Sequence, residues 1–245
     1  MKSLYEIFNG KPNPKRLLRN IRQEKYSQAP IADTQAESRL VGDIVKLPAN
    51  DAIRVINAFA DRYPQRSDLQ KEIYKKHTEN EVKERILTHL AREGQTMQMA
   101  DLLQGDIDNV GNSADPSEAT GQRIMHALSL IAGQDRTNNP GTYDVMIQIL
   151  TGLPQKDQFQ ALDTLQQNVQ QANARELLST LAKKTDDTNI GMNALATMLN
   201  NRGNNIPSEQ IAVVINAHSG DSARTLIDFI NDHRPQDFDI LRHVA

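Results

Sequence analysis

The chain has 245 residues, with 28 basic and 31 acidic side chains, a net charge of −3 and an aromatic content of 4%. It contains no Cys, which excludes disulfides, thiolate metal sites, Cys nucleophiles and iron–sulfur clusters. It also lacks Trp, which argues against aromatic stacking platforms for bases or sugars.

The first segment of the chain is basic. Residues 1–27 hold seven basic and two acidic side chains, a net charge of about +5, so the rest of the chain carries about −8. Leu17, Leu18 and Ile21 form an apolar stripe at helical spacing within this segment. Such a helix can bind an anionic membrane surface, nucleic acid or an acidic partner, or it can simply pack on the helices that follow. The candidate contacts for an anionic partner or a membrane surface are Lys15, Arg16, Arg19, Arg22 and Lys25.

Membrane spans and export signals are not expected. The longest apolar runs are short, such as residues 211–215, and the first eight residues contain no continuous apolar stretch. We therefore expect a cytoplasmic protein, or one that is delivered into a host cytosol by a route that does not read such a signal.

From residue 40 onward, apolar residues recur at spacings of three and four, and alternating strand patterns are nearly absent. The sequence therefore predicts an all-α protein with about thirteen helices of roughly 9–16 residues. Helix boundaries carry signals as well: Thr78 with Glu81 has the pattern of a capping box. Gly94, Gly133 and Gly203 stand where a left-handed residue would end a helix.

Two internal similarities indicate a repeat. Residues 52–69 align without a gap on residues 223–240, and residues 43–60 align on residues 149–166. The offsets are 171 and 106 residues, and both are close to multiples of a period of about 34 residues, the length of a helix–turn–helix repeat. This period predicts turns near residues 48, 78, 115, 154, 187 and 219.

These observations predict a right-handed α-solenoid of about six helical hairpins, and an irregular multi-helix bundle is the alternative. The expected organisation is a basic, partly helical segment over residues 1–32, followed by a helical-repeat domain over residues 33–245. A capping helix is expected around residues 238–244.

The hairpin from Thr142-Tyr143-Asp144 to Ala161-Leu162 resembles a tetratricopeptide or pentatricopeptide repeat. Tyr143 is an aromatic residue early in the first helix, Gly152 lies near the turn, and Ala161 stands where two helices would meet closely. The resemblance covers this hairpin, and the other hairpins share only its period. The pentatricopeptide resemblance implies RNA binding.

Motifs that carry chemistry are few. The segment from Gly105 begins like a calcium loop, with Asp106 and Asp108 at its acidic positions, but its last position is Ser117 rather than Glu. We therefore interpret residues 104–116 as a polar connection between helices. His218 lies near Ser219 and Asp221, although closeness in sequence is poor support for a catalytic triad. No metal site, cofactor or catalytic residue is assigned.

The sequence favours a non-enzymatic scaffold or adaptor that binds a protein or peptide partner through an extended helical-repeat surface. One alternative is an RNA-binding repeat protein, although the acidic body argues against nucleic acid, which needs positive charge. The other is an enzyme whose site does not form a sequence motif. A Cys-free, Gln- and Asn-rich helical chain is also compatible with a secreted bacterial effector.

Overall fold

The computed structural model describes residues 12–23, 34–109, 118–134, 141–185, 187–200 and 208–233. Within these ranges the chain is all-α, with thirteen helices and no strand. It forms two compact units, Met1–Leu102 and Leu103–Ala245. No helix in the described ranges is long and apolar enough to cross a membrane.

The helices of the first unit are α2 (Pro14–Arg22), α3 (Thr34–Val45), α4 (Ala49–Arg62), α5 (Ser67–Lys76) and α6 (Asn80–Arg92). The boundary between the units falls within α7 (Thr96–Asn109). The remaining helices belong to the second unit: α8 (Glu118–Ala132), α9 (Gly141–Thr151), α10 (Gln155–Gln167), α11 (Ala172–Lys184), α12 (Thr188–Asn200), α13 (Ser208–Asn216) and α14 (Gly220–His233).

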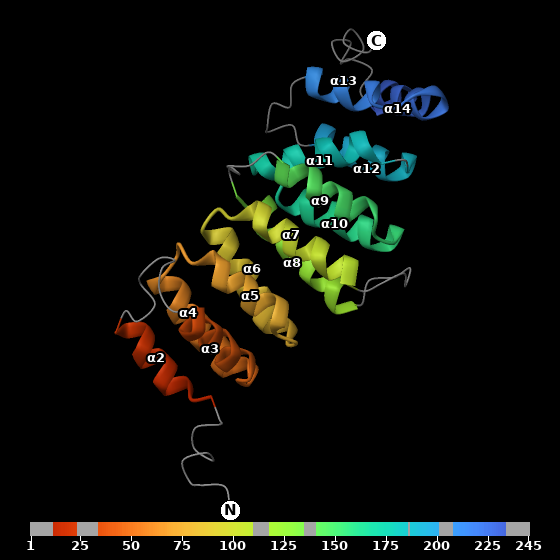
Figure 1. Ribbon diagram of the computed structural model, residues 1–245. Helices are drawn as coiled ribbons and strands as arrows, with labels where there is room; N and C mark the ends of the chain where they lie inside the picture. Colours follow the sequence, from red (N-terminus) through yellow and green to blue (C-terminus); the bar gives the residue numbers. More distant parts are fainter. Residues whose placement is uncertain are drawn as a thin grey trace, which may run out of the picture. The chain divides into compact units, whose positions relative to one another are not determined.

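In the first unit, alternate helices pack against one another. Helix α3 packs on α5, whereas α2 packs on α4 and α4 packs on α6 (Figure 1). The amphipathic stripe of α4 fills the space between these helices, because Val55, Ile56 and Phe59 are almost fully buried. The Phe59 and Tyr63 rings lie 5.1 Å apart and tilted, a common aromatic pair geometry.

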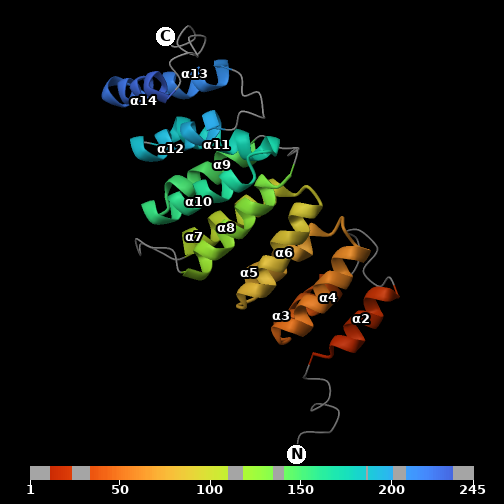
Figure 2. The same cartoon turned by 180° about the vertical axis from the view of Figure 1, so that it is seen from behind.

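The second unit shows the same alternation. Helix α11 packs on both α9 and α13, and α10 packs on both α8 and α12, which in turn packs on α14 (Figure 2). Helix α11 is central to this unit and has buried residues along most of its length, including Leu177, Leu178 and Leu181. Each helix from α8 to α14 therefore contacts the helix two places away along the chain, which buries one stripe on each of them.

The turns that join α3 to α4 and α9 to α10 have the same local structure. In both, a buried Leu precedes a Pro that stands immediately before the second helix, with φ and ψ of −56° and 148° at Pro48 and −54° and 145° at Pro154. Pro suits this position because its fixed φ matches and a helix start has no acceptor for its missing N–H. The carbonyl of Pro48 accepts from the Asp51 amide at 3.0 Å, and that of Pro154 accepts from the Asp157 amide at 2.8 Å.

The turns predicted near residues 48, 78, 154, 187 and 219 are confirmed, because a helix ends and the next begins around each position. The sixth predicted turn, near residue 115, lies outside the described residues, as does the capping helix expected around residues 238–244.

Three local predictions are wrong. Helix α6 begins at Asn80 with Glu79 as its N-cap, one residue later than a Thr78–Glu81 capping box requires, and the Glu79 amide donates to His77 Nδ1 at 3.1 Å. Gly94 has a left-handed φ of 71°, as expected, but Gly133 does not have a positive φ. Gly203 lies outside the described residues.

The third correction concerns the predicted polar connection over residues 104–116. Residues 104–109 instead continue α7, which ends at Asn109. Asp106, with a side chain 12% exposed, lies beside the buried Arg123 of α8, with 2.8 Å between the carboxylate Oδ2 and the guanidinium Nη2. This ion pair gives the carboxylate a structural partner and removes it from any calcium loop.

Polar side chains also connect one hairpin to the next. Arg66, 7% exposed, pairs with Glu37 of α3 at 2.7 Å and with Asp68 of α5 at 3.0 Å. The two carboxylates raise the pKa of the guanidinium, and the bidentate contact lowers the pKa of Asp68. In the last turns of α4 and α6, Asp61 and Arg92 lie 2.9 Å apart, which shows that these two helices run parallel.

Candidate interaction surfaces

Helix α2 is built by the basic segment that the sequence singled out. Asn13 caps it, because its side-chain oxygen accepts from the amides of Lys15 and Arg16 at 3.0 and 3.3 Å. Leu17 and Ile21 are buried, and Leu18 is half-buried. The helix packs on α4, and the Tyr63 hydroxyl donates to the Ile21 carbonyl at 3.0 Å. The expectation that the apolar stripe packs on the following helices is confirmed.

The charges of α2 divide into two groups. Arg16 pairs with Asp43 of α3 at 3.2 Å and thereby helps to fix α2 on its neighbours. Lys15, Arg19 and Arg22 are exposed, and no ion pair is found for them among the residues that the structure describes. At 100° per residue these three lie opposite Leu17 and Ile21, and we call them the α2 basic face. The fifth candidate, Lys25, lies outside the described residues.

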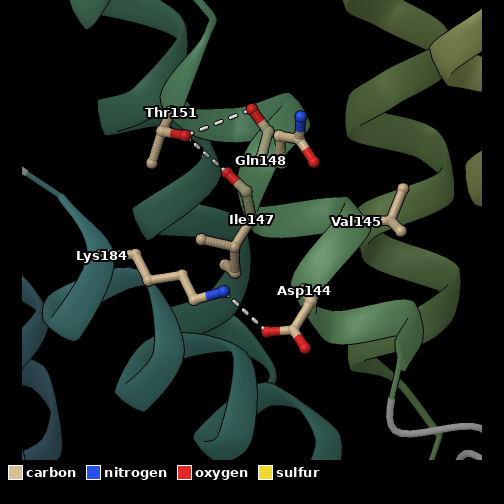
Figure 3. A pocket seen from close by; sticks show the side chains of 6 residues that line it. All are labelled: Asp144, Val145, Ile147, Gln148, Thr151 and Lys184. Atoms are coloured by element: carbon tan, nitrogen blue, oxygen red, sulfur yellow. Dashed lines mark hydrogen bonds and ion pairs between the residues drawn. The ribbon is translucent and has the colours of Figure 1, made fainter.

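A pocket of about 410 Å³ lies at the junction of α9 and α11 (Figure 3). Helix α9 supplies most of the lining and α11 supplies Lys184, whose ammonium lies 2.9 Å from a carboxylate oxygen of Asp144. The residues that line the pocket are Asp144, Val145, Ile147, Gln148, Thr151 and Lys184.

The pocket combines a pair of opposite charges with apolar and amide side chains. Both members of the Asp144–Lys184 pair are more than half exposed, so water screens the pair and its two charges can be offered to a ligand. The Thr151 hydroxyl donates within its own helix, to the carbonyls of Ile147 and Gln148 at 2.9 and 3.2 Å. The lining contains no pair of a nucleophile and a general base.

Groups with shifted pKa values lie away from this pocket. Burial lowers the pKa of His77 and His89, and it raises the pKa of Glu93 and Tyr143. None of these four side chains lines the pocket between α9 and α11. Over the described ranges, no three His, Asp or Glu side chains gather closely enough to hold a metal ion.

His218 has a structural partner. Its Nε2–H donates to the carbonyl of Ala182 near the end of α11, at 2.6 Å, so that the ring joins the turn before α14 to α11. The imidazole ring also lies 3.6 Å from the position that a Cβ on Gly191 would occupy. These contacts assign the ring to packing between hairpins rather than to a triad with Ser219 and Asp221.

The α9–α11 pocket was not predicted from the sequence. Asp144 and Lys184 are 40 residues apart, and each is an ordinary charged residue on a helix surface. Only the packing of α11 on α9 brings the two side chains together. The hairpin period predicts roughly which turns of the two helices lie side by side, but it does not predict which side chains meet.

Comparisons with known proteins identify no relative. No protein-family model, no curated protein and no solved structure matches this chain.

Proposed function

We propose that this chain is a non-enzymatic scaffold that binds a protein or peptide partner through the surface of six helical hairpins stacked as a right-handed α-solenoid. The observation that carries the proposal is the alternating packing within each unit, in which first helices of hairpins contact first helices and second helices contact second helices. Stacks of this kind bury a continuous core and leave long faces for partners.

The sequence offsets agree with this architecture. An offset of 171 residues carries Ala49–Arg62, the bounds of α4, onto Gly220–His233, the bounds of α14. An offset of 106 residues carries the first residue of α4 onto Gln155, the first residue of α10. All three are second helices of their hairpins, so residues that align in sequence also occupy equivalent places in the packing.

Bonds between consecutive hairpins support the same period. Glu37–Arg66, Asp61–Arg92 and Gln155–Asp187 are separated by 29, 31 and 32 residues, and each joins one hairpin to the next. The Asp144–Lys184 pair also joins consecutive hairpins, over 40 residues, so these separations scatter around the period of about 34 residues expected for a stack of similar units.

The pocket between α9 and α11 is where we expect a peptide side chain to bind, because a carboxylate and an ammonium lie beside apolar and amide groups there. Nucleic acid is disfavoured as the partner, since the chain outside residues 1–27 carries a net charge of about −8.

The test is affinity capture from an extract of the source cell, followed by reconstitution with the purified partner. A Val145→Glu/Gln148→Glu variant adds two charges to the pocket, and a Gln160→Glu/Gln166→Glu variant adds two charges to exposed positions of α10. We expect the first variant to weaken partner binding at least tenfold and the second to leave it unchanged. Equal binding by both variants and the unchanged protein would place the partner elsewhere, and retention of RNA with a steep salt dependence would refute the proposal.

A further inference from the structure

The α2 basic face lies at the edge of a helix layer. In the first unit, α2 packs on α4 and α4 packs on α6, so α2 begins this series among the described helices. Leu17 and Ile21, 2% and 1% exposed, point toward α4. The opposite side of α2 carries Lys15, Arg19 and Arg22, which are exposed. This side of the helix is therefore an exposed cationic strip.

Helix α14 has the complementary arrangement in the second unit. It packs on α12 and α13, and its buried residues are Leu226 and Ile230, 0% and 1% exposed. Asp221, Asp228 and Asp232 are exposed on the opposite side, and no ion pair is found for them among the described residues. We call these three carboxylates the α14 acidic face. The same side carries one cation, Arg224, and keeps a net negative charge.

The spacing of the two faces matches. Lys15 and Arg22 are seven residues apart, and so are Asp221 and Asp228. Seven residues are about two helical turns, or about 10.5 Å along the axis. Two helices laid side by side can therefore bring both cations opposite both carboxylates at once, with Arg19 between them.

We propose that the α2 basic face docks on the α14 acidic face of a second copy of this chain. Among the described helices, α14 is the last of the series α8–α10–α12–α14 in the second unit, and α2 is the first of the series α2–α4–α6 in the first unit. The contact joins two different faces, so it is heterologous and can extend from copy to copy. This inference rests on the two helix faces and not on the partner proposed above.

The contact consists of exposed charge pairs, so it is weak and sensitive to salt. At 0.5 M salt the screening length is only about 4 Å, and exposed charges barely attract each other. The test is sedimentation equilibrium of the intact chain from 10 to 500 µM, in 20 mM and in 500 mM NaCl. We expect the average mass to rise above the monomer value of 27.4 kDa with concentration at low salt, and to return to it at high salt.

Charge reversal tests the two faces separately. The Lys15→Glu/Arg19→Glu/Arg22→Glu variant and the Asp221→Lys/Asp228→Lys/Asp232→Lys variant should each remain monomeric alone, because each then has like charges on both faces. Mixed together they should associate again, since each reversed face finds a complementary face on the other variant. Rescue on mixing cannot come from a misfolded variant.

A matched control separates the faces from net charge. The Lys46→Glu/Lys75→Glu/Arg85→Glu variant makes the same charge change at exposed positions outside the α2 basic face, and we expect it to associate as the unchanged protein does. A constant monomer mass at 500 µM and low salt would overturn the proposal. So would loss of association in the control, absence of rescue on mixing, or a compact monomer whose hydrodynamic radius alone responds to the reversals.

Discussion

The hydrogen bonds of Asn173 are predicted to hold three helices of the second unit together. Asn173 is 1% exposed at the start of α11. Its Oδ1 accepts from the Tyr143 hydroxyl of α9 at 2.7 Å, and its Nδ2 donates to the Ile131 carbonyl near the end of α8 at 3.0 Å. One side chain therefore joins helices of three consecutive hairpins, and one of its partners is the aromatic residue that motivated the tetratricopeptide resemblance.

The expected effect follows from these two bonds. Each contributes a net stabilisation of about 1 kcal/mol, and a buried carbonyl left without a donor costs a further 1–3 kcal/mol or so. Asn173→Ala should therefore reduce the free energy of unfolding by about 3–5 kcal/mol. Tyr143→Phe removes only one bond but leaves the buried Asn173 Oδ1 without a donor, so it should reduce the free energy of unfolding by about 2–4 kcal/mol. The double variant should lose at least about 1 kcal/mol less than the sum of the two single losses, because the bond between the two side chains is removed in each single variant and so is counted twice in that sum.

The assay is urea denaturation of the intact chain followed by circular dichroism, with amide hydrogen exchange to locate the change in α8, α9 and α11. Asn193→Ala is the matched control, because Asn193 is exposed and bonds only within its own helix, to the Asn189 carbonyl. It should change stability by less than about 0.5 kcal/mol. Losses for Asn173→Ala no larger than for Asn193→Ala, or strictly additive losses in the double variant, would refute the reasoning.

Three further predictions concern the first unit and α10. Phe59→Ala should reduce stability by about 3–5 kcal/mol because Phe59 is 1% exposed, whereas Phe159→Ala, at a residue 37% exposed, should cost far less in the same urea titration. Gly42→Ala should raise the melting temperature, since Gly42 lies within α3 and a Cβ there meets nothing within 4 Å. Gly94→Ala should lower the melting temperature, because Gly94 has a φ of 71°. Shifts of the same sign in the two variants would contradict this. Burial lowers the pKa of His89 in the folded state, so the unfolded chain binds a proton at higher pH and the free energy of unfolding should fall as pH drops below about 6.5. A His89→Gln variant should lose less of its free energy of unfolding between pH 7 and 5 than the unchanged protein. An equal loss in both proteins would disprove the assignment.

The regular part of the fold was predictable because helix periodicity is a local property. Apolar residues such as Ile56 and Leu162 recur on the helical period and become buried, and Pro48 and Pro154 mark helix starts through a backbone restriction that needs no tertiary contact. The packing of alternate helices could be anticipated only through the internal offsets, which map the first residue of α4 onto the first residues of α10 and α14.

The polar contacts could not be predicted, because their partners are distant in sequence. Nothing near His77 shows that its ring will accept the Glu79 amide at the start of α6. Asp106 resembles a calcium ligand locally, and only the approach of Arg123 from the next helix makes it a structural carboxylate. The basic character of α2 was predicted by charge alone, but the ion pair of Arg16 depended on the position of Asp43 in α3.

We propose that consecutive hairpins pack against one another as a stack. Because the chain contains no Cys, this packing can be tested directly by cross-linking engineered Cys pairs with a short bismaleimide. Asp61→Cys with Arg92→Cys, and Asp144→Cys with Lys184→Cys, replace ion pairs of 2.9 Å between hairpins. Asp61→Cys with Lys76→Cys is the control. Lys76 is the last residue of α5 and lies about 15 Å along the helix axis from the first residue of α5, which follows α4 in the chain. The account predicts rapid intramolecular links in the first two variants and none in the control. Links in the control, or none between the hairpins, would contradict it.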